Sequence, residues 1–262
     1  MTRVSAGSQA RPDRLAVVLV AHGSRDPRGA ASTSALARAV RRARPEWSVH
    51  AAYLDHAGPR PLEVLASLPP GTRAVLVPLL LTAAYHGRVD VPAVLSAAAD
   101  LPVTVLLAEV LGPVPSPVGV PGVPAAVPSL LIDGLMRRLP SGGLDAIVLA
   151  AAGTRDAAAR QTVEWAARAL SARLALPCAV AYASAAPPTA GEAVSRWRAS
   201  GAGGVGVAAY FLAPGFLYDL AARSAFDAGA VVVAEPLGDA PELAALVAAR
   251  VEAVAPRWAA AA

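Results

Sequence analysis

Three side chains that can bind a metal ion or move a proton, His22, Asp55 and His86, lie at or just beyond the ends of three apolar runs. Two imidazoles and one carboxylate form a good ligand set for iron, cobalt, nickel or zinc. They can also transfer protons near neutral pH. His56 neighbours Asp55 and stays open as a further candidate, whereas His50, in the middle of an apolar run, is interpreted as structural. If the runs are parallel strands, the sequence predicts one polar site where they end.

An internal repeat separates this candidate site from its structural background. The sequence VLVAHGSRD (18–26) recurs as VLAAAGTRD (148–156), with the glycine, hydroxyl, arginine and aspartate retained. The three candidate positions hold other residues in the second copy: Ala152, Ser184 and Phe216. We therefore interpret the first copy as the functional one and the second as a degenerate copy that keeps the fold.

Candidate substrate-binding groups flank the two histidines. Ser24 and Arg25 precede an expected helix, and a helix N-terminus can hold anionic groups. The second copy repeats the tetrapeptide GSRD (23–26) as GTRD (153–156). Arg25 can therefore equally well have a structural role, in the turn and in an Arg–Asp contact. Arg88 has no arginine counterpart, since Tyr218 stands at its position in the second copy. Arg88 is the better candidate for binding a carboxylate.

The elements expected to position these residues alternate between short apolar runs and amphipathic helical stretches. Such runs, apolar throughout, are typical of strands that are covered on both faces. The expected strands are Leu15–Ala21, Ser48–Leu54, Ala74–Leu81, Val103–Glu109, Ala146–Ala151, Cys178–Ala183, Val205–Leu212 and Val231–Glu235. The clearest helix patterns are Ala30–Ala43, Ala157–Leu174 and Pro241–Val254. This alternation predicts an α/β fold of two duplicated domains, each a four-stranded parallel sheet flanked by helices.

The repeat also predicts the domain limits. We expect a flexible tail over 1–14, a catalytic domain over 15–139, a linker at 140–144 and a degenerate domain over 145–262. A Pro-rich insertion at about 114–124 lies in the first domain and is interpreted as a surface loop. Two fused copies can pair internally as a pseudo-dimer, so we expect a monomer.

Composition excludes several functional classes. Of the 262 residues, 55% are hydrophobic and 16% charged, which argues against disorder. All 23 basic residues are arginine, so a Walker A loop and a Schiff-base lysine are impossible, and their scatter does not support nucleic-acid binding. One cysteine excludes Cys-rich metal sites. The longest uncharged stretch contains six prolines and is not expected to span a membrane, and a cytoplasmic location is expected.

Three segments carry a resemblance to a known family. VAHGSRDP and VPLLLTAAYHGRVDVP resemble the two signature segments of the sirohydrochlorin chelatases, which need no ATP. AYLDHAGP resembles the middle segment of that family, where glutamate is usual instead of Asp55. The duplicated layout is similar to that of the long, two-domain members, whose active site lies in the N-terminal half.

The resemblance implies insertion of a divalent metal into sirohydrochlorin, a tetrapyrrole with eight carboxylates. Fe²⁺ would give sirohaem and is favoured, and Co²⁺ would give a cobalamin precursor. Fe²⁺, Co²⁺ or Ni²⁺ would be a substrate, with no permanent cofactor. His22, His86 and Asp55 would bind the metal and accept protons, with His56 as an alternative third ligand, and Ser24, Arg25 and Arg88 would bind substrate. A metal or tetrapyrrole carrier without turnover stays open.

Overall fold

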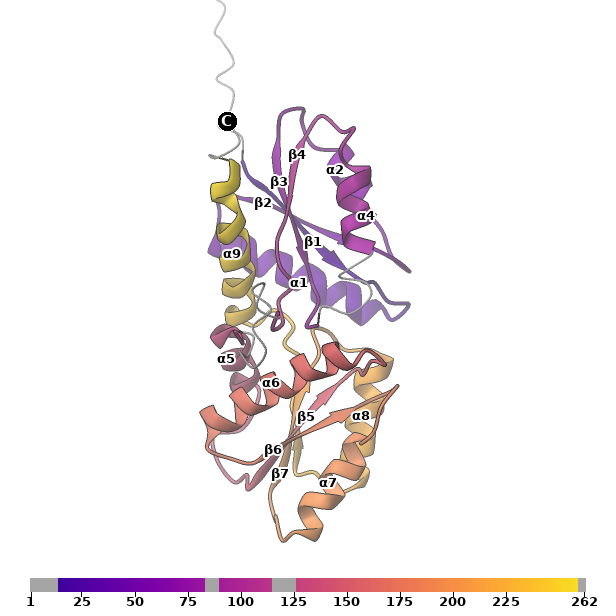
Figure 1. The fold of residues 1–262 in the computed structure, drawn as a ribbon, viewed down its shortest axis with the longest axis vertical. Helices are drawn as coiled ribbons and strands as arrows, with labels where there is room; N and C mark the ends of the chain where they lie inside the picture. The colour runs from indigo at the N-terminus through magenta and orange to yellow at the C-terminus, as the bar shows by residue number, and fades with distance from the viewer. Residues whose placement is uncertain (1–13, 83–89, 115–125, 259–262) are drawn as a thin grey trace, which may run out of the picture.

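The computed structural model describes residues 14–82, 90–114 and 126–258. Its described strands form two four-stranded parallel sheets, one above the other in Figure 1, with the orders β2-β1-β3-β4 and β6-β5-β7-β8. The same order in both halves reflects the repeat in the sequence. The predicted α/β fold with two duplicated parallel sheets is therefore confirmed.

The strands coincide with the predicted apolar runs, although several are shorter. Their bounds are β1 Ala16–Ala21, β2 Ser48–Tyr53, β3 Arg73–Pro78, β4 Thr104–Leu107, β5 Ala146–Ala151, β6 Cys178–Tyr182, β7 Val205–Tyr210 and β8 Val232–Val233. The predicted end of β3 at Leu81 was three residues too late. Leu79 and Leu80 remain apolar, but the Leu80 N–H donates to the carbonyl of Pro78, so the chain turns out of the sheet.

Helices cover both faces of each sheet. Their bounds are α1 Pro27–Ala43, α2 Pro61–Ala66, α4 Asp90–Ala97, α5 Ser129–Arg137, α6 Ala157–Leu174, α7 Ala190–Ala199, α8 Phe216–Asp227 and α9 Pro241–Val254, followed by a 3₁₀ turn over Ala255–Trp258. α2 and α4 pack on one face of the first sheet, and α7 and α8 pack on the corresponding face of the second. The other faces share one apolar layer made of α1, α5, α6 and α9.

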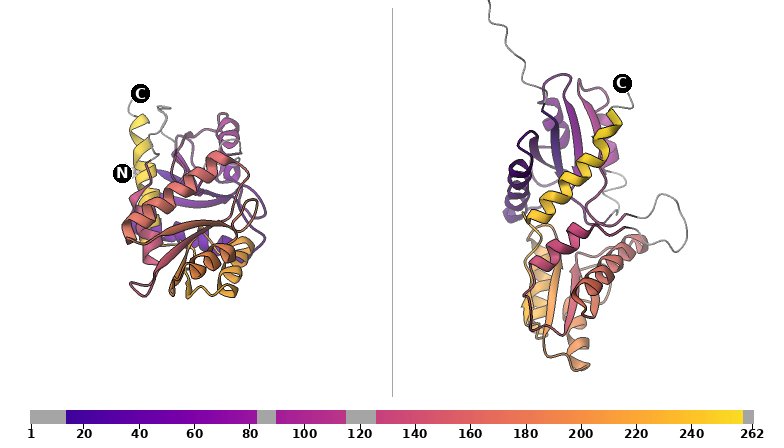
Figure 2. Two further views of the ribbon diagram at one scale, coloured as in Figure 1. Left: turned by 60° about the horizontal axis from the view of Figure 1, so that its bottom comes forward. Right: turned by 90° about the vertical axis from the view of Figure 1, so that its left-hand side faces the viewer.

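The last helix of the chain packs on the first sheet. α9 lies against α1 and β3, whereas α5, which precedes the second sheet, packs against α6 and β7. Figure 2 shows α9 running alongside the first half and α5 alongside the second. The expected division at 140–144 stays a prediction. Each of these two helices covers the sheet that lies on the other side of that division in the sequence.

The two halves share a core instead of meeting only through surface contacts. The largest buried cluster contains β1 and β3 residues from the first sheet, β5 and β7 residues from the second, and the apolar face of α9. Within this interface the buried Tyr210 hydroxyl donates a hydrogen bond of 3.0 Å to the carbonyl of Leu81. The relative position of the halves is thus held by both packing and a buried polar contact.

None of the helices within the described residues combines the length and the apolar character needed to cross a membrane.

Candidate functional site

A glycine turn brings the His22 loop against the end of β2. Gly23 has φ of 96°, which favours glycine, and a Cβ there would lie 1.8 Å from the carbonyl oxygen of Asp55. The Asp55 N–H in turn donates to the carbonyl of His22 at 2.8 Å. Gly153 in the second copy also has φ of 96° and lies equally close to Ser184. The repeated glycine therefore serves the close approach of two loops in both halves.

The residues that follow the glycine in the repeated tetrapeptide, GSRD (23–26) and GTRD (153–156), start a helix in each half. The Asp26 carboxylate accepts a hydrogen bond from the N–H of Arg28 and caps α1, and Ser24 Oγ accepts one from the N–H of Asp26 at 3.0 Å. Thr154 and Asp156 make the same contacts before α6. This repetition gives the motif a structural role. The cap and a proline at N1 start α1 at Pro27, three residues before its predicted start.

The first of these loops carries a cluster that the second lacks. His22, Asp55 and His56 lie together beyond β1 and β2, with the two imidazole ring centroids 6.4 Å apart. His56 Nε2 lies 3.4 Å from Asp55 Oδ2. His22 Nδ1 lies 3.2 Å from the carbonyl oxygen of Gly23. Because a carbonyl only accepts, this contact places the proton of a neutral ring on Nδ1 and the lone pair on Nε2.

The environment of Asp55 favours its carboxylate form. The N–H of His56 donates to Asp55 Oδ1 at 2.8 Å, and this hydrogen bond lowers the pKa of Asp55 below its usual range. Desolvation of the carboxyl opposes this effect, and the charges of His56, Arg60 and His22 lower that pKa further. Arg60 Nη2 lies 3.8 Å from Asp55 Oδ1. Asp55 is therefore an anion at neutral pH, as a ligand to a divalent cation must be.

Two of the predicted site residues, His86 and Arg88, lie outside the described residues. Within the described part of the chain, no three His, Cys, Asp or Glu side chains form a group that could hold a metal ion. The structure thus places His22, Asp55 and His56 together and leaves the position of the second predicted histidine ligand as a prediction.

His22 lines two cavities. One of about 420 Å³ is formed with Asp55, Leu54, Leu62 and residues of α4. The other, of about 210 Å³, lies between the halves, where Gly23 and Ser24 face Leu212, Ala213 and Pro214. The exposed Arg25 lines neither cavity, while Ser24 lines the second. His22 therefore stands where the candidate site opens into the space between the two halves.

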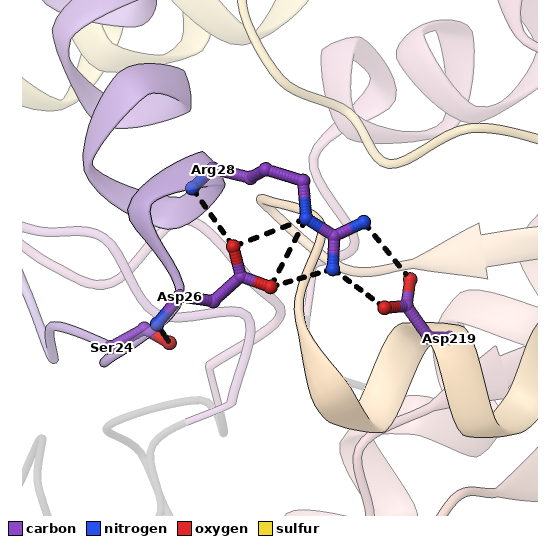
Figure 3. Close-up of polar contacts among 4 residues, drawn as sticks. All are labelled: Ser24, Asp26, Arg28 and Asp219. Atoms are coloured by element: carbon purple, nitrogen blue, oxygen red, sulfur yellow. Dashed lines mark hydrogen bonds and ion pairs between the residues drawn. The ribbon is translucent and has the colours of Figure 1, made fainter.

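An ion-pair network joins the halves beside this second cavity (Figure 3). Arg28 in α1 contacts Asp26, the N-cap residue of that helix, and Asp219 in α8, with Nη2 at 2.6 Å from a carboxylate oxygen of each. The hydrogen bonds to these two carboxylates raise the pKa of Arg28, and the bond from Arg28 lowers the pKa of Asp26. The arginine that Asp26 contacts is thus Arg28 and not Arg25. Sequence reasoning missed Arg28 and Asp219, since a pair 191 residues apart leaves no local signal.

The second copy keeps the architecture of the site without the imidazole and carboxylate groups at the positions of His22 and Asp55. A cavity of about 200 Å³ lies where Ala152 and Gly153 face the segment after β3, and its lining includes Tyr182 and Phe211. Ser184, at the position of Asp55, donates its hydroxyl proton to the carbonyl of Ala152 at 2.9 Å. This copy presents neither an imidazole nor a carboxylate among these residues, as the repeat predicts.

His50 is remote from this chemistry. It lies within β2, half-buried, and its Nε2 is 2.8 Å from Ser48 Oγ. Burial lowers the pKa of His50, and the charge of Arg41 lowers it further. The structural interpretation of His50 agrees with this position.

Comparison with known proteins identifies the family. The model of the CbiX family matches residues 16–120 and 146–254, once in each half. The chain belongs to the CbiX family, and the resemblance to sirohydrochlorin chelatases drawn from the sequence is confirmed. Among curated proteins, no match was found.

Solved structures share the fold over nearly the whole chain. SirB from Bacillus subtilis with Fe³⁺ superposes with a TM-score of 0.74 at 19% identity, covering 94% of this chain and 98% of its own. The sirohydrochlorin chelatase SirB from Bacillus subtilis subspecies spizizenii, in complex with cobalt, gives 0.74 at 18% identity, covering 93% and 96%. CbiX, the terminal enzyme for siroheme biosynthesis in denitrifying bacteria, gives 0.60 at 20% identity, covering 90% and 98%. At these identities the likeness establishes the two-sheet fold.

Proposed function

We propose that this protein inserts a divalent metal into sirohydrochlorin, with Fe²⁺ as the metal and sirohaem as the product. Membership of the CbiX family supports this proposal, as do the names of the similar structures: one is a sirohydrochlorin chelatase with cobalt and another an enzyme of siroheme biosynthesis. Co²⁺ insertion is the alternative, because imidazole and carboxylate ligands accept both ions.

The reaction fixes what the site must supply. The metal-free macrocycle carries two pyrrole N–H groups, and insertion of M²⁺ forms the metal–nitrogen bonds while two protons leave. The metal must also lose its water ligands. Groups that can bind M²⁺ and accept protons near neutral pH are therefore required in one place, and neutral imidazole and carboxylate meet both needs.

The observation that carries the proposal is the His22–Asp55–His56 cluster at the edge of the first sheet. Asp55 is held as an anion, and the neutral form of His22 that fits its backbone contact has its lone pair on Nε2. In our proposal His22 and His86 bind the metal and accept protons, and Asp55 is the third ligand or proton acceptor. His56, 3.4 Å from Asp55, can replace it as the third ligand.

The test is an anaerobic assay of the purified protein with sirohydrochlorin and Fe²⁺, Co²⁺ or Ni²⁺ in turn, following the absorbance change on metallation. We expect multiple turnovers above the spontaneous rate with the wild type and their loss in His22→Ala and His86→Ala. His50→Ala is the matched control and should retain activity, because its ring lies within β2.

Separate Asp55→Ala and His56→Ala variants distinguish the two candidates for the third ligand. The ligand is the residue whose removal abolishes turnover while the other variant stays active. Binding of metal and tetrapyrrole without release of metallated product would replace the chelatase proposal with a carrier function. The chelatase proposal would be refuted if the protein accelerated metallation with none of the three metals.

A further inference from the structure

The N-terminal end of α8 presents large apolar side chains to solvent. Phe216, its first residue, is 76% exposed, and Leu220, one helical turn further on, is 42% exposed. A phenylalanine so exposed contributes little to the core, and exposed apolar groups beside a cavity commonly mark a binding surface. The packing of the second half therefore does not explain why an aromatic residue stands at this position.

This end of α8 adjoins the cavity that His22 lines. Leu212, Ala213 and Pro214 form the wall of that cavity on the side of the second half, and Phe216 follows two residues after Pro214. Asp219, on the first turn of the same helix, pairs with Arg28, so this end of α8 is held beside the start of α1 (Figure 3). Phe216 thus begins the helix that follows directly on the apolar wall of the cavity, and Leu220 lies one helical turn beyond it.

The internal repeat gives Phe216 a second meaning. Phe216 occupies the position of His86 in the first half, and the two other lost groups became the small residues Ala152 and Ser184. Loss of a ligand alone imposes no large side chain. An exposed aromatic ring at this position, next to the functional half, fits a contribution from the degenerate half to binding.

We propose that Phe216 and Leu220 form an apolar platform for the flat conjugated face of the tetrapyrrole, while the first half supplies the metal-binding groups. The inference rests on the proposed function. A conjugated macrocycle offers the apolar face against which an aromatic ring stacks. Two side chains are too few for a stable contact with another protein, which buries roughly 1,200 Å² or more. Continuity with the His22 cavity also favours a small planar ligand.

The test measures binding of metal-free sirohydrochlorin by quenching of its fluorescence, together with KM and kcat in the metallation assay. Loss of one stacking contact should raise Kd and KM of Phe216→Ala about tenfold, with kcat nearly unchanged. Phe216→Tyr keeps the ring and should restore both constants. Phe226→Ala is the matched control, because Phe226 lies near the opposite end of α8 and is 54% exposed.

The outcomes distinguish failure of the apolar platform from failure of the proposed chelatase function. A wild type that turns over, with Phe216→Ala binding equally well, overturns the platform and leaves the chelatase proposal intact. An equal loss in Phe226→Ala overturns it as well, since the effect would not be local. A wild-type dimer in gel filtration that Phe216→Ala dissolves assigns the surface to a second copy and overturns it. A wild type that neither binds nor metallates sirohydrochlorin overturns the proposed function itself.

Discussion

Arg28 and Asp219, which lie 191 residues apart in different halves, form a two-point ion pair, with Nη2–Oδ2 at 2.6 Å and Nη1–Oδ1 at 3.3 Å. Arg28 belongs to the first turn of the helix that follows the His22 loop, and Asp219 belongs to the first turn of α8. The pair therefore joins the two walls of the cavity between the halves at its edge. Both side chains are substantially exposed, at 49% and 39%, so solvent and salt weaken the contact.

Removal of this pair should loosen the start of α8 without unfolding the protein. We expect Asp219→Ala to speed amide hydrogen exchange over residues 214–222 at low salt while the melting temperature stays nearly unchanged. In wild type, high salt should produce the same effect, because it screens exposed charges. Glu164→Ala removes an exposed ion pair within α6 and serves as the control. Unchanged exchange in Asp219→Ala would mean that packing alone holds α8.

Matched glycine substitutions should separate fold from function. Gly23→Ala and Gly153→Ala both force a Cβ to within 2 Å of a carbonyl oxygen at the same positive φ of 96°. Each should lower the free energy of unfolding by about 1–3 kcal/mol. Only Gly23→Ala moves the His22 loop away from Asp55, so only this variant should lose most of its metallation activity. Thermal melts and the assay check both effects, and an equal loss of activity in both variants would contradict this interpretation.

The pH dependence should follow histidine and not Asp55. The lowered pKa of Asp55 keeps its carboxylate ionised down through pH 5, and the stability that this group contributes is lost only as pH falls through that lowered value. The imidazole of an unperturbed histidine has a pKa of about 6.5. Activity should therefore fall between pH 7.5 and 5.5 in a protein that circular dichroism shows to be folded.

An Asp55→Asn variant provides the control for that profile. It should be less active at every pH while its acid limb stays in place. Full activity of the wild type at pH 5 would count against histidine as ligand or base.

Cys178, the only cysteine of the chain, should report on unfolding. Burial in β6 raises the pKa of its thiol to about 12, so roughly 10⁻⁴ of it is the reactive thiolate at pH 8. Labelling by a disulfide reagent should be slow in the native protein and fast in urea. In the unfolded chain the thiol has a pKa of about 8.5. The free energy of unfolding should therefore also decline as the pH rises above that pKa. Rapid labelling of the native protein would show that β6 opens.

Local patterns accounted for most of the fold and part of the site. The apolar runs and the repeat located all eight described strands, and α6 and α9 begin and end where their amphipathic patterns do. The cluster of His22 with Asp55 followed from the rule that parallel strands end at one edge. The packing of α5 on the second sheet and of α9 on the first could not be predicted, because contacts distant in sequence decide which sheet an apolar helix face covers. The same reason hid the pair of Arg28 with Asp219.

The position of α9 has a consequence for how the protein is made. α9 is synthesised after all eight strands that the structure describes, yet it covers a face of the first sheet, against β3 and α1. During translation this apolar face, which backs the strands that carry His22 and Asp55, stays without its last helix until residue 254 has left the ribosome. Exposed apolar surface on a nascent chain promotes association and chaperone binding. The functional half is thus begun first and finished last.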